Sequence, residues 1–236
     1  VSLWDIAALV PIVEEAGAAI NRELTERVGA ILRDRKIPVV VGGDHSVPYG
    51  AIAACAAAMG DQPLGVLHLD AHADLRPAYE GFTWSHASIM RNVVDRIPLV
   101  RLVQVGIRDF SDGELDVIKA QPGRVTTYFD AHLRAARLRG DFQTVAQAIA
   151  EQLPENVYLS FDIDGLEPTL CPHTGTPVPG GLSFDEIVAL LDAVVGAKRR
   201  IVGMDLVEIA PDPALGDDEL DASWDANVGA RLLYKM

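Results

Sequence analysis

Acidic and imidazole side chains follow several of the apolar runs in this chain. They are Asp44 and His45 after residues 39–41, Asp70, His72 and Asp74 after 64–69, Asp162 and Asp164 after 157–161, and Glu208 after 201–207. Each run has the length and composition of a buried strand, so these groups stand at strand ends. Carboxylates and imidazoles are common ligands of divalent metals and common acids and bases in hydrolysis.

The intervening segments predict the elements that would position these groups. Strands are expected at about 37–41 (a buried strand), 64–69, 99–105, 124–128, 157–161 and 200–207, and helices at about 3–35, 48–59, 86–94, 112–120, 141–152, 183–195 and 227–234. Ser183 and Glu186 form a capping box. Apolar strands separated by helices predict an α/β fold with a mostly parallel sheet covered on both faces. Ligands of such sheets bind beyond the carboxyl ends of the strands.

Metal binding is the chemistry that best explains this convergence of charge. Buried carboxylates cost several kcal/mol each unless they are paired or bound to a cation. Asp162 and Asp164 alternate, so an extended segment points both to one face, about 7 Å apart along the chain. Asp70 and Asp74 would lie ~13 Å apart in an extended segment. The segment therefore either curls or serves two ions, which in such sites lie ~3.5–4 Å apart.

The donor set indicates which metals would bind. It is rich in oxygen, includes the imidazoles of His45 and His72, and contains no thiolate. Such a set favours manganese, with zinc, iron, cobalt or nickel as alternatives. Calcium and magnesium are less suited because they prefer oxygen ligands.

Two other histidines have different expected roles. His86 stands near a predicted helix start after the second motif, and its ordinary pKa near neutrality suits a proton shuttle or a substrate contact. His68 alternates with the apolar residues of its strand and is expected to be structural.

The bulk composition narrows the function classes. The formal net charge of −14 disfavours nucleic acid and anionic membranes as partners and is compatible with a small cationic substrate. No apolar run approaches the ~20 residues of a membrane span. The two cysteines, Cys55 and Cys171, lie far apart, which is typical of a reducing cytoplasm rather than a disulfide framework.

Taken together and in this order, the motifs resemble those of the arginase/agmatinase (ureohydrolase) family. The matching segments are GGDHS at 42–46, DAHAD at 70–74, SFDIDGLEP at 160–168, GTPVPGGL at 175–182, EIAP at 208–211 and WDANVGAR at 224–231. The resemblance implies a three-layer α/β/α sandwich, shared with the deacetylases, and a homo-oligomer, either trimer or hexamer. It also implies that residues 1–236 form a single catalytic domain lacking the family's first strand and loop.

The resemblance further assigns roles to individual residues. One manganese ion would be held by His45, Asp70, Asp74 and Asp162, and the other by His72, Asp70, Asp162 and Asp164. Water activated between two metals would attack a guanidinium carbon. Asp74 would pass a proton to the leaving amine, Glu208 would pair with the guanidinium, and His86 would shuttle protons or steady the substrate.

The substrate is less closely constrained, and agmatine, hydrolysed to putrescine and urea, is the leading expectation. The loop at 75–85 lacks the Asn-bearing segment of arginases, and Ala87-Ser88 replaces the Gly-Thr usual in agmatinases. Formiminoglutamases often show Asp-Leu-Arg, as Asp74 to Arg76 do here, so Arg76 would bind a substrate carboxylate or pair with Glu80. Arginase, formiminoglutamase and other guanidino-acid or guanidine hydrolases remain alternatives.

Two more distant alternatives also remain. A single-zinc deacylase of the same fold would need fewer ligands than this chain offers. A non-catalytic family member would bind metal without turnover.

Overall fold

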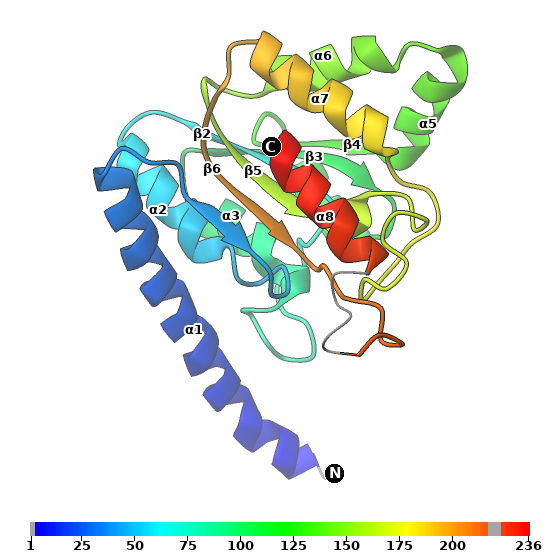
Figure 1. Cartoon of the computed structure of the whole chain (residues 1–236). Coiled ribbons are helices and arrows are strands. Elements are labelled where there is room, and N and C mark those ends of the chain that lie inside the picture. The colour runs from blue at the N-terminus through cyan, green and yellow to red at the C-terminus, as the bar shows by residue number, and fades with distance from the viewer. Residues whose placement is uncertain (1–2, 217–222) are drawn as a thin grey trace.

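The fold is built on one parallel sheet. The computed structural model describes residues 3–216 and 223–236, with side chains from residue 15 onward. Its strands are β1 (Val39–Val41), β2 (Leu64–Leu69), β3 (Val100–Ile107), β4 (Val125–Phe129), β5 (Asn156–Asp162) and β6 (Arg200–Val207). They pair in the order β1-β6-β5-β2-β3-β4, every pair parallel (Figure 1). All their carboxyl ends therefore meet at one edge of the sheet.

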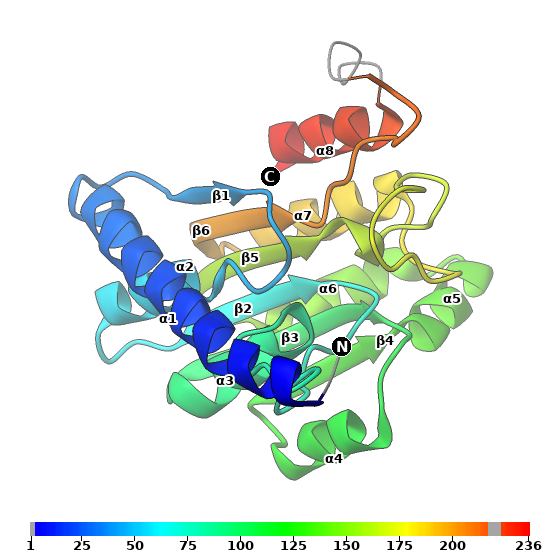
Figure 2. The ribbon, with the colours of Figure 1, turned by 90° about the horizontal axis from the view of Figure 1, so that it is seen from below.

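Helices cover both faces of the sheet, which gives the three expected layers (Figure 2). One face carries α5 (Asp130–Arg139), α6 (Phe142–Gln152), α7 (Phe184–Gly196) and α8 (Trp224–Lys235); the other carries α1 (Leu3–Arg33), α2 (Tyr49–Met59), α3 (Ile89–Arg96) and α4 (Asp112–Ala120). Two short 3-10 turns, η1 (His86–Ser88) and η2 (Ile163–Gly165), follow the site motifs. The amino-terminal half of α1 extends away from the sheet (Figure 1).

Two hydrophobic cores form because successive strand residues point to opposite faces. On β2, Leu67 and Leu69 pack under α5–α8, whereas Leu64 and Val66 pack under α1–α4. Every residue of β2 and β5 is buried, as expected for strands covered on both faces. The central strands are thus rigid supports for the residues at their carboxyl ends.

The structure departs from the sequence-based prediction in two elements. The prediction of a buried first strand at 37–41 is wrong: β1 is shorter, and Val39 and Val41 are 48% and 58% exposed. Within the described chain β1 pairs only with β6, so it forms an edge of the sheet. Helix α5 was not predicted, although its Leu133 and Ala136 are buried in a core.

The predicted capping box is confirmed. The capping box of Ser183 and Glu186 starts α7, and its Ser183 Oγ accepts a bond from the Glu186 N–H at 3.3 Å. Cys55 and Cys171 are both free and buried; a cytoplasmic setting stays a prediction. Among the described residues, no helix is long and apolar enough to cross a membrane.

Gly203 on β6 offers a test of how tightly the sheet packs against α2. A Cβ added there would lie 2.8 Å from Cys55 Sγ and 2.9 Å from the Tyr158 ring, both fully buried. Gly203→Ala should lower the free energy of unfolding by about 1–3 kcal/mol, because overpacking displaces neighbours from their rotamers. Urea unfolding followed by circular dichroism measures this loss. In the control Gly113→Ala on α4, the added Cβ meets nothing within 4 Å, and an equal loss there would contradict the packing argument.

Candidate metal centre

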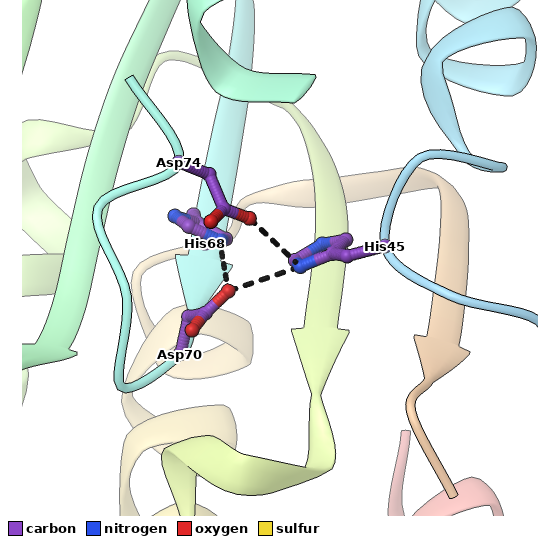
Figure 3. Close-up of side chains that lie close together, drawn as sticks. All are labelled: His45, His68, Asp70 and Asp74. Atoms are coloured by element: carbon purple, nitrogen blue, oxygen red, sulfur yellow. Dashed lines mark hydrogen bonds and ion pairs between the residues drawn. The ribbon is translucent and has the colours of Figure 1, made fainter. Parts of the chain in front are cut away.

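Two groups of potential metal ligands converge at the carboxyl edge of the sheet, and they share Asp70. The first is His45, His68, Asp70 and Asp74, and the second is Asp70, His72 and Asp164, with the ligand atoms of each group within 4.8 Å of one another. Figure 3 shows the first group. All of these residues are buried except His72, whose side chain is 25% exposed.

The first group is centred on the imidazole of His45. Its Nδ1 lies 3.0 Å from Asp70 Oδ2, 3.3 Å from Asp74 Oδ2 and 3.2 Å from Asp162 Oδ2. These residues come from the loops after β1 and β2 and from the end of β5. Segments far apart in the sequence thus place three carboxylate oxygens around one imidazole nitrogen.

The second group is centred on His72. Its Nδ1 lies 3.0 Å from Asp164 Oδ2 and 3.4 Å from Asp70 Oδ1. Asp70 therefore turns one carboxylate oxygen to His45 and the other to His72. A carboxylate placed in this way can contribute to both ligand groups. Asp162 belongs to the first group, because its carboxylate contacts His45. That Asp162 also binds the second metal stays a prediction.

The segment after β2 curls, so Asp70 and Asp74 lie closer together than they would in an extended segment. Asp74 adopts a positive φ of 54°, a conformation that non-glycine residues rarely take. The Ala71 N–H donates to Asp164 Oδ1 at 3.0 Å, so the β2 and β5 loops are tied together. A Cβ on Gly165 would lie 2.8 Å from the Asp70 backbone nitrogen, so only glycine permits this approach.

The buried charges of the two ligand groups would be stabilised by a bound cation. Burial and the neighbouring Asp70 charge raise the pKa of Asp74 to about 7, and burial with the Asp70 and Asp164 charges raises the pKa of Asp162 well above its usual range. Burial opposes ionisation of Asp70 as well, but three imidazoles outweigh it and hold the pKa of Asp70 well below the ordinary value. Hydrogen bonds to Asp164 and Asp70 overcome burial and raise the pKa of His72 to about 11.

The residues present fit a pair of divalent ions. Metal ligands without their metal tend to bind protons instead. The raised pKa values of the buried carboxylates and of the His45 and His72 imidazoles fit this behaviour. The donors are oxygen and imidazole nitrogen, which suits manganese and other first-row divalent ions.

A row of polar side chains lies under the site on the α1–α4 face of the sheet. His45 Nε2 is 2.9 Å from Ser160 Oγ, and Ser160 Oγ donates to Asp205 Oδ1 at 3.3 Å. The Phe161 N–H also donates to Asp205 Oδ1, at 3.1 Å. If Nδ1 of His45 binds a metal, Nε2 carries the proton and donates to Ser160, which is the usual support for a histidine ligand.

The two predicted residues outside the ligand groups also lie at this edge. Glu208 follows β6 with φ of 61°, and its Oε1 accepts a hydrogen bond from the His45 N–H at 3.0 Å. His86 lines a cavity of about 150 Å³ together with His72 and Asp74, and its ring contacts Tyr79 at 5.4 Å between centroids. The cavity therefore opens next to the ligand groups.

Sequence reasoning missed Arg108, which holds together the loops that carry the candidate ligands. Its guanidinium donates only to backbone carbonyls: Gly106, Asp164, Gly165, Leu166 and Val178, at distances from 2.7 to 3.4 Å. These carbonyls belong to the end of β3, to η2 and to the Pro- and Gly-rich loop. The only sequence signal was an arginine directly after an apolar strand, which by itself has no single meaning.

Arg108→Lys should loosen η2 and weaken metal binding. Lysine cannot reproduce the planar fork, and each buried carbonyl left without a donor costs about 1–3 kcal/mol. Manganese affinity should fall by about 10-fold, the lower end for supporting residues, as measured by isothermal titration calorimetry.

Arg124→Lys is the matched control. Arg124 also donates to backbone carbonyls, those of Val94, Ile97 and Val100, but at the amino ends of β3 and β4. It should lower stability without changing manganese affinity. An equal loss of affinity in both variants would show that the Arg108 effect is only general destabilisation.

Comparison with known proteins agrees with this geometry. The model of the Arginase family matches residues 3–236. The N(1)-aminopropylagmatine ureohydrolase of Thermus thermophilus is 40% identical over 209 residues, covering 87% of this chain and 67% of the relative. The agmatinase of Halalkalibacterium halodurans is 33% identical, covering 78% of this chain and 59% of the relative. The chain thus spans about two thirds of the length of the curated relatives it matches.

Solved structures share the fold as well. A putative agmatinase from Clostridium difficile superposes with a TM-score of 0.74 at 25% identity, covering 91% of this chain and 71% of the other. An arginase from Medicago truncatula gives 0.73 at 28% identity, covering 91% and 63%. The family match over nearly the whole chain, together with these relatives, shows that this chain belongs to the arginase family.

Proposed function

We propose that this chain is a binuclear metal hydrolase that cleaves a guanidino C–N bond to give urea and an amine. The observation that carries the proposal is the pair of ligand groups joined by Asp70. Membership of the arginase family supports the reaction class. Relatives named agmatinase and N(1)-aminopropylagmatine ureohydrolase support agmatine, or a similar cationic guanidino compound, as the substrate.

Two Mn²⁺ ions are the proposed cofactors. His45, Asp70, Asp74 and Asp162 would hold one ion, and His72, Asp70, Asp162 and Asp164 the other. When bound, such a pair supplies a nucleophilic water at neutral pH. The chain itself supplies the orientation of the substrate and the movement of protons.

Three residues of the chain would act on the substrate. Glu208 lies beside the first ligand group through its bond to the His45 N–H, and its carboxylate would accept two hydrogen bonds from a guanidinium. Asp74 lines the cavity and would pass a proton from the attacking water to the leaving amine. His86 shares that cavity and would steady the substrate or relay a proton to solvent.

The charges lining the cavity favour a cationic substrate tail over a carboxylate. Arg76 lines the cavity, but its Nε lies 3.6 Å from the buried Glu114 carboxylate rather than beside Glu80, and its guanidinium covers the Tyr79 ring at 5.5 Å. Asp109 adds a carboxylate whose side chain is 62% exposed. Arg76 is thus paired with Glu114, and Asp109 Oδ2 lies 3.9 Å from His72 Nε2. Acidic side chains still outnumber the one arginine on the cavity wall, which carries Asp74, Asp109 and Glu114.

We also propose an oligomeric state and a cellular location. A homo-oligomer, trimer or hexamer, is proposed on the family resemblance alone. A cytoplasmic location is proposed because both cysteines are free thiols, as is usual in reducing compartments.

A urea-release panel tests the reaction and the substrate. Manganese-loaded protein should release urea from agmatine faster than from arginine, guanidinobutyrate, guanidine or formiminoglutamate, because acidic side chains outnumber the one arginine on the cavity wall. Urea released only from another member of the panel would overturn the choice of agmatine. Acetate released from acetyl-polyamines with zinc would instead support the single-zinc deacylase.

Glu208→Gln tests the guanidinium contact. The amide keeps an oxygen for the His45 N–H but loses the charge, so kcat/KM for agmatine should fall by about 10–100-fold, the worth of one or two charged hydrogen bonds. Manganese content should not change. Glu80→Gln is the matched control, since Glu80 also has a positive φ, 51°, and is exposed. A loss of similar size in the control would remove the assigned role from Glu208.

A further inference from the structure

One row of side chains crosses the sheet directly beneath the proposed metal site. The register pairs Asp205 of β6 with Ser160 of β5, Ser160 with His68 of β2, His68 with Gln104 of β3, and Gln104 with Thr127 of β4. All five are polar, although most of their neighbours within these strands are apolar. The Asp205 and Ser160 end of the row supports His45; the other end has no role in the reaction proposed above.

Hydrogen bonds determine how Gln104 is oriented. Its amide nitrogen donates to the Ala73 carbonyl at 2.7 Å, and its amide oxygen accepts from Thr127 Oγ1 at 2.9 Å. A carbonyl can only accept, so the nitrogen must face Ala73. The second hydrogen of the same nitrogen points to His68 Nδ1, 3.1 Å away. Gln104 is therefore a donor to His68.

This donor determines the tautomer of His68. Because Nδ1 accepts from an amide N–H, it carries no proton, and the proton of the neutral ring is on Nε2. Nε2 lies 2.8 Å from Asp70 Oδ2 and so donates to it (Figure 3). A protonated Nε2 has no lone pair for a metal. His68 is thus not a ligand, although its distances alone would admit it to the first group.

The geometry assigns His68 the role of a positioning residue: with Gln104 and Thr127, it holds the Asp70 carboxylate so that its two oxygens face the two ligand groups. The inference rests on the proposed metal centre. Asp70 Oδ2 receives the His68 hydrogen bond on one side and faces His45 Nδ1 at 3.0 Å on the other. Oδ1 faces His72. Oδ1 also accepts a hydrogen bond from the His72 N–H at 2.5 Å, so each oxygen has its own donor, and rotation of the carboxylate would break both bonds.

Calorimetric titration of the metal-free chain with Mn²⁺ tests this role without relying on activity. Wild-type protein should bind two ions. His68→Phe keeps a ring but removes the donor to Asp70, and Gln104→Leu removes the donor that sets the tautomer. Both variants should still bind two ions, with affinity lower by about 10–100-fold, as for other residues that orient metal ligands.

Asn156→Leu is the matched control. Asn156 is a buried amide on the same face of the sheet, but at the amino end of β5, where it bonds to Gln62 and Arg200. Its loss should reduce stability and leave manganese affinity unchanged. If His68→Phe and Gln104→Leu lower only the stability, as this control does, the inference is wrong.

Other outcomes separate the inference from the proposed function. A fall from two ions to one in His68→Phe, with Gln104→Leu unchanged, would make His68 a ligand and overturn the inference while leaving the hydrolase proposal standing. Wild-type protein that binds fewer than about one ion would overturn the metal centre and the inference together. If both core variants fail to fold, Thr127→Val carries the test, since it removes one partly buried hydroxyl. Unchanged manganese affinity in Thr127→Val would contradict the inference.

Discussion

Mutual repulsion among buried carboxylates is the constraint on which this structure depends. Asp70, Asp74, Asp162 and Asp164 are each 4% exposed or less. Burial, together with the charge of Asp70, raises the pKa values of the other three above the ordinary value. Without metal, protons and imidazolium groups compensate this charge. A pair of divalent cations would do so more completely. Most of the unusual local features serve to keep these groups together.

The backbone is forced into uncommon conformations at the site. Asp74 and Glu208 both have positive φ values, which cost of order 1–3 kcal/mol each unless the surroundings over-determine them. The surroundings here include the Arg91 N–H, which donates to the Asp74 carbonyl at 3.0 Å, and Thr174 Oγ1, which donates to the Glu208 carbonyl at 2.9 Å. These contacts explain how loops, which are usually mobile, can hold ligands at fixed positions. The proposed chemistry therefore depends on residues that never touch a substrate.

The parallel sheet contributes more than a shared edge. Because parallel strands pair in register, one polar residue on each of five strands produces a continuous row across the sheet. Such a row costs stability unless its members are hydrogen-bonded. Most of it is satisfied, but Asp205 Oδ2 and the Tyr158 hydroxyl are without a hydrogen bond among the described atoms. Burial raises the pKa of Asp205 to about 6. The site thus lies next to a row of polar side chains inside an apolar core.

The sequence alone predicted the layers, the parallel sheet and the candidate ligand residues, because strand-end position and donor type are local properties. It could place Asp70 and Asp162 at strand ends, and the motif resemblance could assign them to metals. It could not tell that β1 is an exposed edge, since exposure depends on which strand lies beside it. His68 alternates with apolar residues and was expected to be structural, and no pattern in the sequence singled out Gln104. Only the register of β2 against β3 brings them together, and only the resulting hydrogen bonds decide that His68 donates to Asp70. Register and tautomer depend on the whole fold, and no local pattern encodes either.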